Sequence, residues 1–206
     1  MLFRSSFFIA NRVWNTYFDF ADIVKNQIPS FDGSKTVGIH YRGTDKNTDL
    51  SQANPITHDE VFVIIEDFLK NNQDIKNIYC CSDEQQFVDK VASRFNTYTI
   101  IQYDQNRSQQ GTYAFFREGE YVNKEMQDSM TIAALVDMIS LSKCHTVLKT
   151  SSALSAFSKI INPQLNLYAI SAMKQRWFPT GVVEGYQSNS QEVNKILNRT
   201  MYAHVF

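Results

Sequence analysis

Five short runs of β-branched and other apolar residues recur along the chain, and they constrain its fold more than any other feature. The runs cover residues 36–41, 77–81, 98–102, 146–149 and 165–170. Each has the length and composition of a buried strand. Segments with helical spacing of apolar residues lie between the runs, an alternation typical of a parallel sheet covered by helices on both faces. We therefore predict an α/β fold with a parallel sheet of about five strands.

Capping residues and apolar stripes indicate where the helices lie. Thr57 and Glu60 have the spacing of a capping box, and Ser82 and Gln85 repeat that spacing further along the chain. We expect a helix to begin at each of these boxes. Further helices are expected over residues 6–27, 124–143, 152–161 and 191–199, and a long loop is expected over 104–121. The first of these helices carries an apolar stripe formed by Ile9, Val13, Tyr17, Phe20 and Val24.

The composition excludes several classes of protein. Of 206 residues, 43% are apolar and 20% are charged, which is typical of a folded domain. Twenty Lys and Arg residues against 21 Asp and Glu residues give a formal charge of -1, so nucleic acid is not an expected partner. No run approaches the roughly 18 apolar residues that a membrane span needs, and we find no signal peptide. We therefore expect a cytoplasmic protein.

The three cysteines indicate neither a disulfide framework nor a zinc site. Cys80 and Cys81 are neighbours in a predicted strand, which would point them to opposite faces of the sheet. The chain has no Cys-x-x-Cys spacing and no His pair at a ligand interval. We interpret these two residues and Cys144 as small buried apolar residues, and we expect no metal.

Polar residues cluster where three of the predicted strands end. The ends of parallel strands meet at one edge of a sheet, where ligands of such sheets bind. At and after the end of the strand at 36–41 lie His40, Arg42, Thr44, Asp45 and Lys46. Ser82 and Asp83 follow the strand at 77–81, and Thr150, Ser151 and Ser152 follow the strand at 146–149.

These strand ends carry the chemistry of a phosphate site. The guanidinium group of Arg42 can bind phosphate oxygens through two hydrogen bonds. Ser151 and Ser152 offer hydroxyl and N–H groups at a helix N-terminus, which favours an anion. In the alternative interpretation, Arg42 pairs with Asp45 at the surface and the serines only cap a helix.

The usual motifs of nucleotide and hydrolase sites are missing. The chain has no Gly-x-Gly-x-x-Gly after the first predicted strand, no Gly-x-x-x-x-Gly-Lys-Ser/Thr and no Gly-x-Ser-x-Gly. These absences argue against a dinucleotide-dependent dehydrogenase, a P-loop protein and a serine hydrolase of the usual kind. They also leave no clear nucleophile.

Three blocks resemble, in the same order, the α1,6-fucosyltransferases and their relatives, the nodulation fucosyltransferases and protein O-fucosyltransferases. Residues 37–46 (Val-Gly-Ile-His-Tyr-Arg-Gly-Thr-Asp-Lys) resemble the family segment His-x-Arg-x-Thr-Asp-Lys. Residues 78–83 (Ile-Tyr-Cys-Cys-Ser-Asp) are similar to its second strand. Residues 136–142, followed by 147–152, resemble a helix Asp and then a strand that ends in a Ser pair. The similarity spans roughly residues 36–162.

The resemblance implies a Rossmann-like half of a GT-B fold that binds a nucleotide sugar. Residues 1–206 would form this single domain, with an N-terminal helix in 1–35, the α/β core in 36–170 and a C-terminal tail and helix in 171–206. The implied activity is glycosyl transfer from GDP-fucose with inversion at the sugar carbon. Neither a metal nor a cofactor is implied besides the donor substrate.

The resemblance also assigns roles to individual residues. Arg42 would bind the diphosphate and stabilise the leaving GDP, and His40 would contact the nucleotide. Asp137 would accept hydrogen bonds from guanine, and Asp49 is a hypothetical catalytic base. The remaining donor-binding residues would be Thr44, Asp45, Lys46, Ser82, Asp83, Thr150, Ser151 and Ser152.

The chain also departs from the family pattern. Gly43 stands where the α1,6 enzymes carry a second arginine, and His145 replaces a common Asp. Only 35 residues precede the first predicted strand, so we expect the acceptor domain on another chain or in a homo-oligomer, and the acceptor, a glycan or a protein, is open. The stripe over 6–27 would cover the sheet or face that partner. The alternatives are a non-catalytic nucleotide-sugar module that acts with a protein partner, and a purely structural domain.

Overall fold

A six-stranded parallel sheet forms the centre of the computed structural model, which describes residues 2–43, 54–108, 124–172, 178–179 and 182–202. The order within these residues is β3-β2-β1-β4-β5-β6. The strands are β1 (Thr36–Tyr41), β2 (Asn77–Ser82), β3 (Thr99–Ile101), β4 (Thr146–Lys149), β5 (Asn166–Ala169) and β6 (Glu184–Gly185). This is the order of a Rossmann-like sheet, with its topological switch point between β1 and β4. The α/β class is therefore confirmed.

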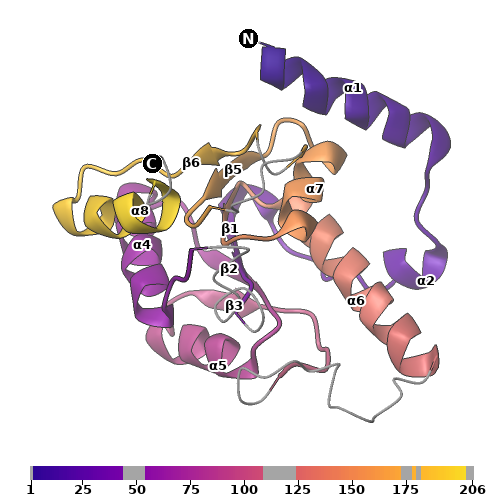
Figure 1. Cartoon of the computed structure of the whole chain (residues 1–206). Coiled ribbons are helices and arrows are strands. Elements are labelled where there is room, and N and C mark those ends of the chain that lie inside the picture. Colours follow the sequence, from indigo (N-terminus) through magenta and orange to yellow (C-terminus); the bar gives the residue numbers. More distant parts are fainter. Residues whose placement is uncertain (1, 44–53, 109–123, 173–177, 180–181, 203–206) are drawn as a thin grey trace.

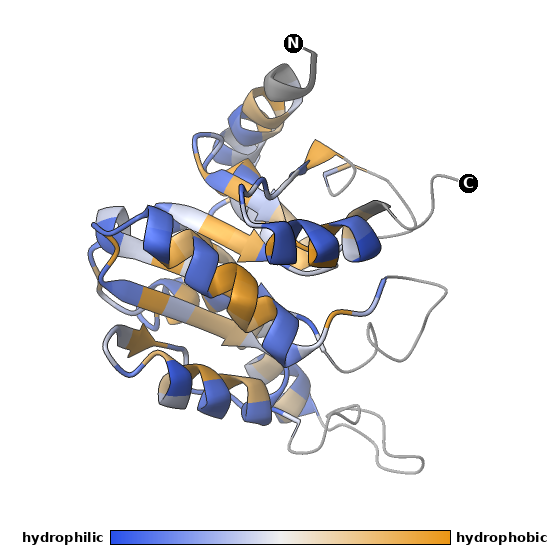
Figure 2. Cartoon of the chain, turned by 90° about the vertical axis from the view of Figure 1, so that its left-hand side faces the viewer, coloured by the Kyte–Doolittle hydropathy of each residue, from blue (hydrophilic) through white to orange (hydrophobic). Residues whose placement is uncertain are grey.

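Helices cover both faces of the sheet (Figure 1). Helices α4 (His58–Asn71), α5 (Gln85–Arg94) and α8 (Gln191–Tyr202) lie on one face. Helices α6 (Lys124–Lys143) and α7 (Ala153–Ile161) lie on the other, where α1 (Leu2–Tyr17) packs on α7 and the short α2 (Asp22–Lys25) packs on α6. A single 3₁₀ turn, η1 (Gly33–Lys35), leads into β1. In Figure 2, where α4, α5 and α8 face the viewer, the strands behind them are largely hydrophobic.

The central strand β1 is buried along its whole length. Val37, Ile39 and Tyr41 belong to the apolar core under α4, α5 and α8. The intervening residues, Gly38 and His40, face α6 and α7 because side chains alternate along a strand. A Cβ atom at Gly38 would lie 2.8 Å from Leu141 Cδ2, so glycine lets α6 approach the sheet closely.

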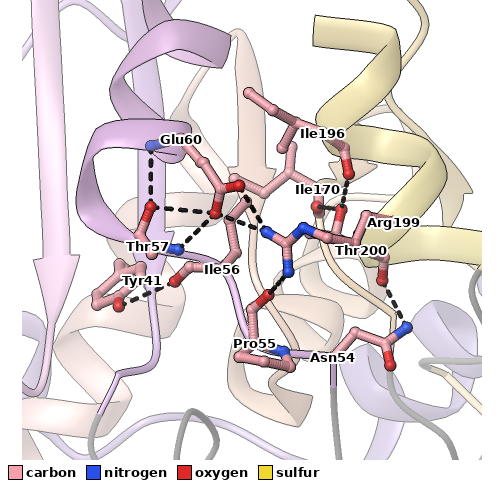
Figure 3. A network of polar contacts seen from close by, with 10 residues as sticks. All are labelled: Tyr41, Asn54, Pro55, Ile56, Thr57, Glu60, Ile170, Ile196, Arg199 and Thr200. Carbon is pink, nitrogen blue, oxygen red and sulfur yellow. Dashed lines mark hydrogen bonds and ion pairs between the residues drawn. The ribbon is translucent and has the colours of Figure 1, made fainter.

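A network of polar contacts joins α8 to the start of α4 (Figure 3). Thr57 and Glu60 form the predicted capping box, with Thr57 Oγ1 accepting from the Glu60 N–H group at 3.3 Å. Arg199 donates through Nη2 to both carboxylate oxygens of Glu60 at 2.6 Å, and through Nη1 to the Pro55 carbonyl at 2.9 Å. These contacts hold the last helix against the second half of the β1–α4 connection.

The predicted bounds of the N-terminal helix were wrong. The helix does not run over 6–27, because α1 ends at Tyr17 and Asp19 then accepts a hydrogen bond from the Phe20 N–H group at 2.8 Å. The side of α1 that packs on α7 carries Phe7, so the part of the expected stripe on α1 does not cover the sheet, and the alternative that it faces a partner stays a prediction. Ile9 and Val13, from that stripe, are 64% and 48% exposed.

Other differences are smaller. Ser82 ends β2 instead of capping a helix, and α5 begins at Gln85 after Glu84, which makes no side-chain cap. The sheet has a sixth strand, β6, whose two residues give no sequence pattern. Residues 104–107 lie outside helices and strands as predicted for a loop, Ser108 forms an isolated bridge with Glu84, and 109–121 lie outside the described residues. Among the helices that the structure describes, none is both long and apolar enough to span a membrane.

Loss of the capping box should destabilise the protein. In Thr57→Ala the Glu60 N–H group loses its acceptor, and we expect the free energy of unfolding to fall by about 1 kcal/mol in urea denaturation. The control is Thr131→Ala, because Thr131 is exposed within α6 and its hydroxyl only donates to the Gln127 carbonyl. That variant should stay within about 0.5 kcal/mol of the original protein. Equal losses in both variants would contradict the prediction.

Candidate functional site

A pocket of about 160 Å³ opens at the carboxyl ends of β1 and β2, beside α6 and the start of α7. We call it the edge pocket. Its lining includes four of the residues predicted at the strand ends and Asp137 from α6. The lining residues are His40, Arg42, Cys81, Ser82, Asp83, Gln105, Asn106, Ser129, Met130, Ala133, Ala134, Asp137 and Leu154. The sheet therefore brings together residues that are almost 100 positions apart in the sequence.

Side chains from two neighbouring strands hold the chain where β1 ends. The Arg42 N–H group donates to Thr150 Oγ1 at 2.8 Å, and Thr150 Oγ1 donates to the His40 carbonyl at 3.3 Å. On the other side, the Gly43 N–H group donates to Asp83 Oδ1 at 3.0 Å. Beyond Tyr41 the sheet has no further pairing, so the side chains of Thr150 and Asp83 accept the hydrogen bonds that a neighbouring strand would otherwise accept. These two contacts fix the main chain at Arg42.

Arg42 provides the positive charge of the edge pocket. Its Nε atom lies 3.2 Å from Asp83 Oδ2, and its side chain is 36% exposed while that of Asp83 is 11% exposed. Asp83 therefore orients the guanidinium group, and part of Arg42 remains open to the pocket. The alternative partner, Asp45, lies outside the described residues.

His40 is a neutral imidazole inside the edge pocket. Burial lowers the pKa of His40 to about 3, and the positive charges of Lys149 and Arg42 add to this effect. Its Nδ1 atom is buried and has no hydrogen-bond partner among the described residues. A buried polar atom without a partner is rare in folded proteins and points to a missing ligand or water.

Asp137 lies at the buried end of the edge pocket and is 3% exposed. Tyr79 donates to Oδ1 at 2.6 Å, and Gln105 donates through Nε2 to Oδ2 at 2.8 Å. Burial raises the pKa of Asp137, while the hydrogen bonds from Tyr79, Cys81 and Gln105 oppose the increase. The carboxyl group is thus held in a fixed orientation by three donors.

The serines after β4 have different surroundings. Ser152 caps α7, with its Oγ accepting from the Leu154 N–H group at 3.3 Å, as one of the two sequence interpretations expected. Ser151 is 1% exposed; its N–H group donates to Ser171, and its Oγ has no partner among the described residues. Neither serine lines the edge pocket as the described residues form it. Ser82 does line it, and its Oγ accepts from the Glu84 N–H group at 3.1 Å.

Part of the predicted site cannot be placed. Thr44, Asp45, Lys46 and the hypothetical base Asp49 lie outside the described residues. Their roles remain predictions. Within the described residues no three His, Cys, Asp or Glu side chains gather as metal ligands.

Sequence reasoning missed two residues of this region. Gln105, which binds Asp137, lies in the stretch predicted only as a functional loop, where no periodicity marks single residues. Lys149 lies opposite His40 in the sheet and is 2% exposed, and its Nζ donates to the Thr150 carbonyl at 2.8 Å. Burial lowers the pKa of Lys149 to about 7. The apolar run around Lys149 was the available signal, because it already indicated a strand buried on both faces.

The three cysteines have the properties expected of buried apolar residues. Cys80, Cys81 and Cys144 are free and buried. Burial raises the pKa of each thiol, so the thiolate form is disfavoured. None of them is therefore a candidate nucleophile.

Comparison with protein-family models finds no match, and comparison with curated proteins finds none. Solved structures do match in part, among them the following three. NodZ alpha-1,6-fucosyltransferase soaked with GDP-fucose is 18% identical over 74% of this chain and 46% of that chain, with a TM-score of 0.49. Fucosyltransferase NodZ from Bradyrhizobium is 16% identical over 75% and 46%, with a TM-score of 0.47. A mutant of Arabidopsis thaliana FUT1 in complex with GDP is 12% identical over 90% and 36%, with a TM-score of 0.41.

Both NodZ structures are named as fucosyltransferases, the class that the sequence blocks resemble. This chain spans less than half of the length of each of the three proteins. Because the TM-scores are below 0.5, a functional assignment has to rest on the residues of the edge pocket.

The buried Lys149 predicts a pH dependence of stability. Its pKa is about 7 in the folded chain and ordinarily 10.5, so between these values the unfolded chain binds more protons and the free energy of unfolding rises with pH. We expect Lys149→Met to remove at least about 1 kcal/mol of this rise between pH 7 and 9, in urea denaturation. Lys143→Met, at the exposed end of α6, should retain the rise. If the free energy of unfolding of Lys149→Met rose with pH as steeply as that of the original protein, another group would be responsible for the rise.

Proposed function

We propose that the edge pocket binds a nucleotide sugar, GDP-fucose, and that this chain is the donor-binding half of a fucosyltransferase. The transfer would be metal-independent and would invert the configuration at the sugar carbon. The acceptor would be bound largely by a separate domain, on another chain or on a second copy. The family resemblance of the three sequence blocks supports the choice of donor.

The observation that carries the proposal is the buried, unpartnered Nδ1 atom of His40, a residue that lines the pocket together with Arg42 and Asp137. One side of this pocket offers a cation and the other offers a buried carboxyl acceptor. A nucleotide has the complementary ends, namely anionic phosphates and a base with N–H donors. The described part of the pocket, about 160 Å³, is smaller than the roughly 300 Å³ of typical ligand sites and holds a part of such a ligand.

Each pocket residue has a chemical role in this proposal. Arg42 binds the diphosphate and stabilises the negative charge that develops on GDP as the glycosidic bond breaks. Asp83 is a positioning residue, because it orients Arg42 and does not itself suit a phosphate. Neutral His40 contributes a hydrogen bond without adding charge, and Asp137 accepts hydrogen bonds from guanine.

The structure explains why Gly43 cannot be replaced by the arginine of the α1,6 enzymes without rearrangement. A Cβ atom at Gly43 would overlap the Glu84 side chain and approach Tyr41 Cε1 to 2.6 Å. Glu84 is itself held by His58, whose Nε2 lies 2.8 Å from Glu84 Oε2. Among the described residues that line the pocket, Arg42 is the one arginine or lysine, and we assign the diphosphate to it.

Nucleotide binding can be tested by thermal unfolding of the whole chain. GDP and GDP-fucose at about 100 times their Kd should add roughly 2.7 kcal/mol to the free energy of unfolding and raise the Tm by several degrees. UDP, ADP and inorganic phosphate should have smaller effects. Arg42→Ala should abolish the GDP effect, and Arg94→Ala should retain it, since Arg94 lies at the end of α5 and pairs with Glu66 of α4. The absence of any nucleotide effect on the original protein would rule out the proposal.

The role of Asp137 in selecting guanine has its own test. Asp137→Asn replaces one acceptor oxygen by an N–H donor, which would oppose the donors of guanine. We expect a Kd for GDP about tenfold higher, with the weak binding of ADP unchanged. Asp128→Asn, an exposed residue of the same helix, is the control. Equal effects of Asp137→Asn on GDP and ADP would show that Asp137 acts only on the structure of the pocket.

A further inference from the structure

A second concave surface lies away from the edge pocket and has no role in the proposed transfer. It has a volume of about 910 Å³ and runs from the end of α4, past the amino ends of β4 and β5, to β6 and the segment before α8. The edge pocket opens at the carboxyl ends of the strands and on the α6 and α7 face. We call the second surface the amide groove because five carboxamide side chains line it: Asn71, Asn72, Asn166, Gln187 and Asn189.

Four of these carboxamides donate to main-chain carbonyls, Gln187 only through a long contact of 3.5 Å to Gly185 and the three asparagines through shorter ones. The Nδ2 atoms of Asn71 and Asn72 each donate at 2.8 Å to a carbonyl one turn earlier in α4. The Nδ2 atom of Asn166 donates at 3.3 Å to the His145 carbonyl. No described residue donates a hydrogen bond to the Oδ1 atoms of these asparagines. The groove therefore presents acceptors whose orientation is set before a ligand arrives.

Aromatic rings form another part of the lining. The rings of Tyr168 and Tyr186 lie 6.1 Å apart at an angle of 68°, and the Phe68 ring lies 6.3 Å from that of Tyr186. The Tyr186 hydroxyl donates to Asp67 Oδ2 at 2.8 Å, and Ser188 Oγ donates to the same oxygen at 2.8 Å. Phe68 and Tyr186 are buried in the apolar core, whereas Tyr168 is only partly buried and packs against that core. The Tyr168 ring, which Tyr186 supports, thus offers a rigid surface for the C–H groups of a ligand.

The charges in the groove disfavour an anionic ligand. Glu184 contributes a carboxylate, and no lysine or arginine is present among the described residues that line the groove. A phosphate or a carboxylate would therefore meet no permanently charged cation and would be repelled by Glu184. The imidazole of His145 also lines the groove, and its Nδ1 lies 2.9 Å from Thr146 Oγ1. An apolar peptide would bury the carboxamides without satisfying their hydrogen-bonding capacity.

We infer that the amide groove binds a neutral, hydroxyl-rich glycan. The hydroxyl groups of the glycan donate to the fixed carboxamide oxygens, and the C–H face of a sugar ring packs on Tyr168. The volume of about 910 Å³ falls within the range for sites of sizeable ligands and accommodates more than one sugar ring. This binding site is independent of the edge pocket, because it uses the opposite face and the opposite end of the sheet.

The test is an NMR titration of the ¹⁵N-labelled whole chain. Cellohexaose, maltohexaose and xylohexaose are the neutral probes, and a heparin-derived hexasaccharide is the acidic probe. We expect saturable chemical-shift changes at the backbone amides of Asn71, Asn166, Gln187 and Asn189 with at least one neutral probe. The acidic probe should cause none. The absence of saturable changes with all three neutral probes, or tighter binding of the heparin fragment, would overturn the inference.

Variants separate this site from a general effect on the protein and from the proposed nucleotide site. The double variant Asn71→Ala/Asn166→Ala should raise the Kd for the neutral glycan about tenfold, since two acceptors are lost. Asn15→Ala is the matched control: Asn15 is also an exposed helical residue, and its Nδ2 donates to Asn11 four residues earlier. It should bind the glycan as the original protein does. Arg42→Ala should lose GDP and retain the glycan. Unchanged glycan binding in the double variant would overturn the inference.

Discussion

The carboxyl end of β1 is held from both sides, by Thr150 after β4 and by Asp83 after β2, and the geometry of the edge pocket depends on this constraint. β1 is the central strand of the sheet and is buried along its whole length. Beyond Tyr41 the sheet offers no further pairing, so the N–H groups of Arg42 and Gly43 need other acceptors. The two side chains supply these acceptors at 2.8 Å and 3.0 Å. Asp83 additionally pairs with the guanidinium group of Arg42, so one residue fixes both the main chain and the side chain of the pocket's cation.

Burial divides the edge pocket into two ends with different chemistry. Arg42 is partly exposed, whereas Asp137 is almost completely buried and already holds hydrogen bonds from Tyr79 and Gln105. An anionic group is therefore best placed at the open end, where solvent also reduces the cost of its charge. A neutral ring with N–H donors suits the buried end. Between them His40 is uncharged, because burial and two nearby cations disfavour its protonation. This gradient would orient a nucleotide with its base inward and its phosphates outward.

The sequence predicts the sheet well because parallel strands are buried on both faces and appear as continuous apolar runs. The capping box at Thr57 was also predictable, since its two side chains bind each other's main chain within one turn. The prediction of one helix over 6–27 was wrong because the apolar spacing continues past Tyr17, where the helix ends. No local signal in the sequence indicates which side of α1 packs on α7. Ser82 has the spacing of a cap, but its place in the sheet, paired with Tyr41, decides its conformation. Tertiary contacts override local patterns in both cases.

Local sequence patterns predict only part of the edge pocket for the same reason. His40, Arg42 and Asp83 could be placed at one edge because strand ends of a parallel sheet converge there. The contact between Gln105 and Asp137 joins an irregular segment to a helix, and no spacing rule predicts such a pair.

The two concave surfaces differ in their cations: among the described lining residues, the edge pocket has an arginine and the amide groove has neither lysine nor arginine. At the carboxyl edge, Arg42 provides a cation next to a helix N-terminus, and both attract anions. At the amino ends of β4 and β5 the groove instead begins at the C-terminal end of α4, whose carbonyl groups accept the hydrogen bonds of Asn71 and Asn72. A helix C-terminus carries partial negative charge and disfavours an anion. The polarity of the elements is thus consistent with the two proposals, in which a phosphate-bearing ligand binds at the edge pocket and a neutral one at the amide groove.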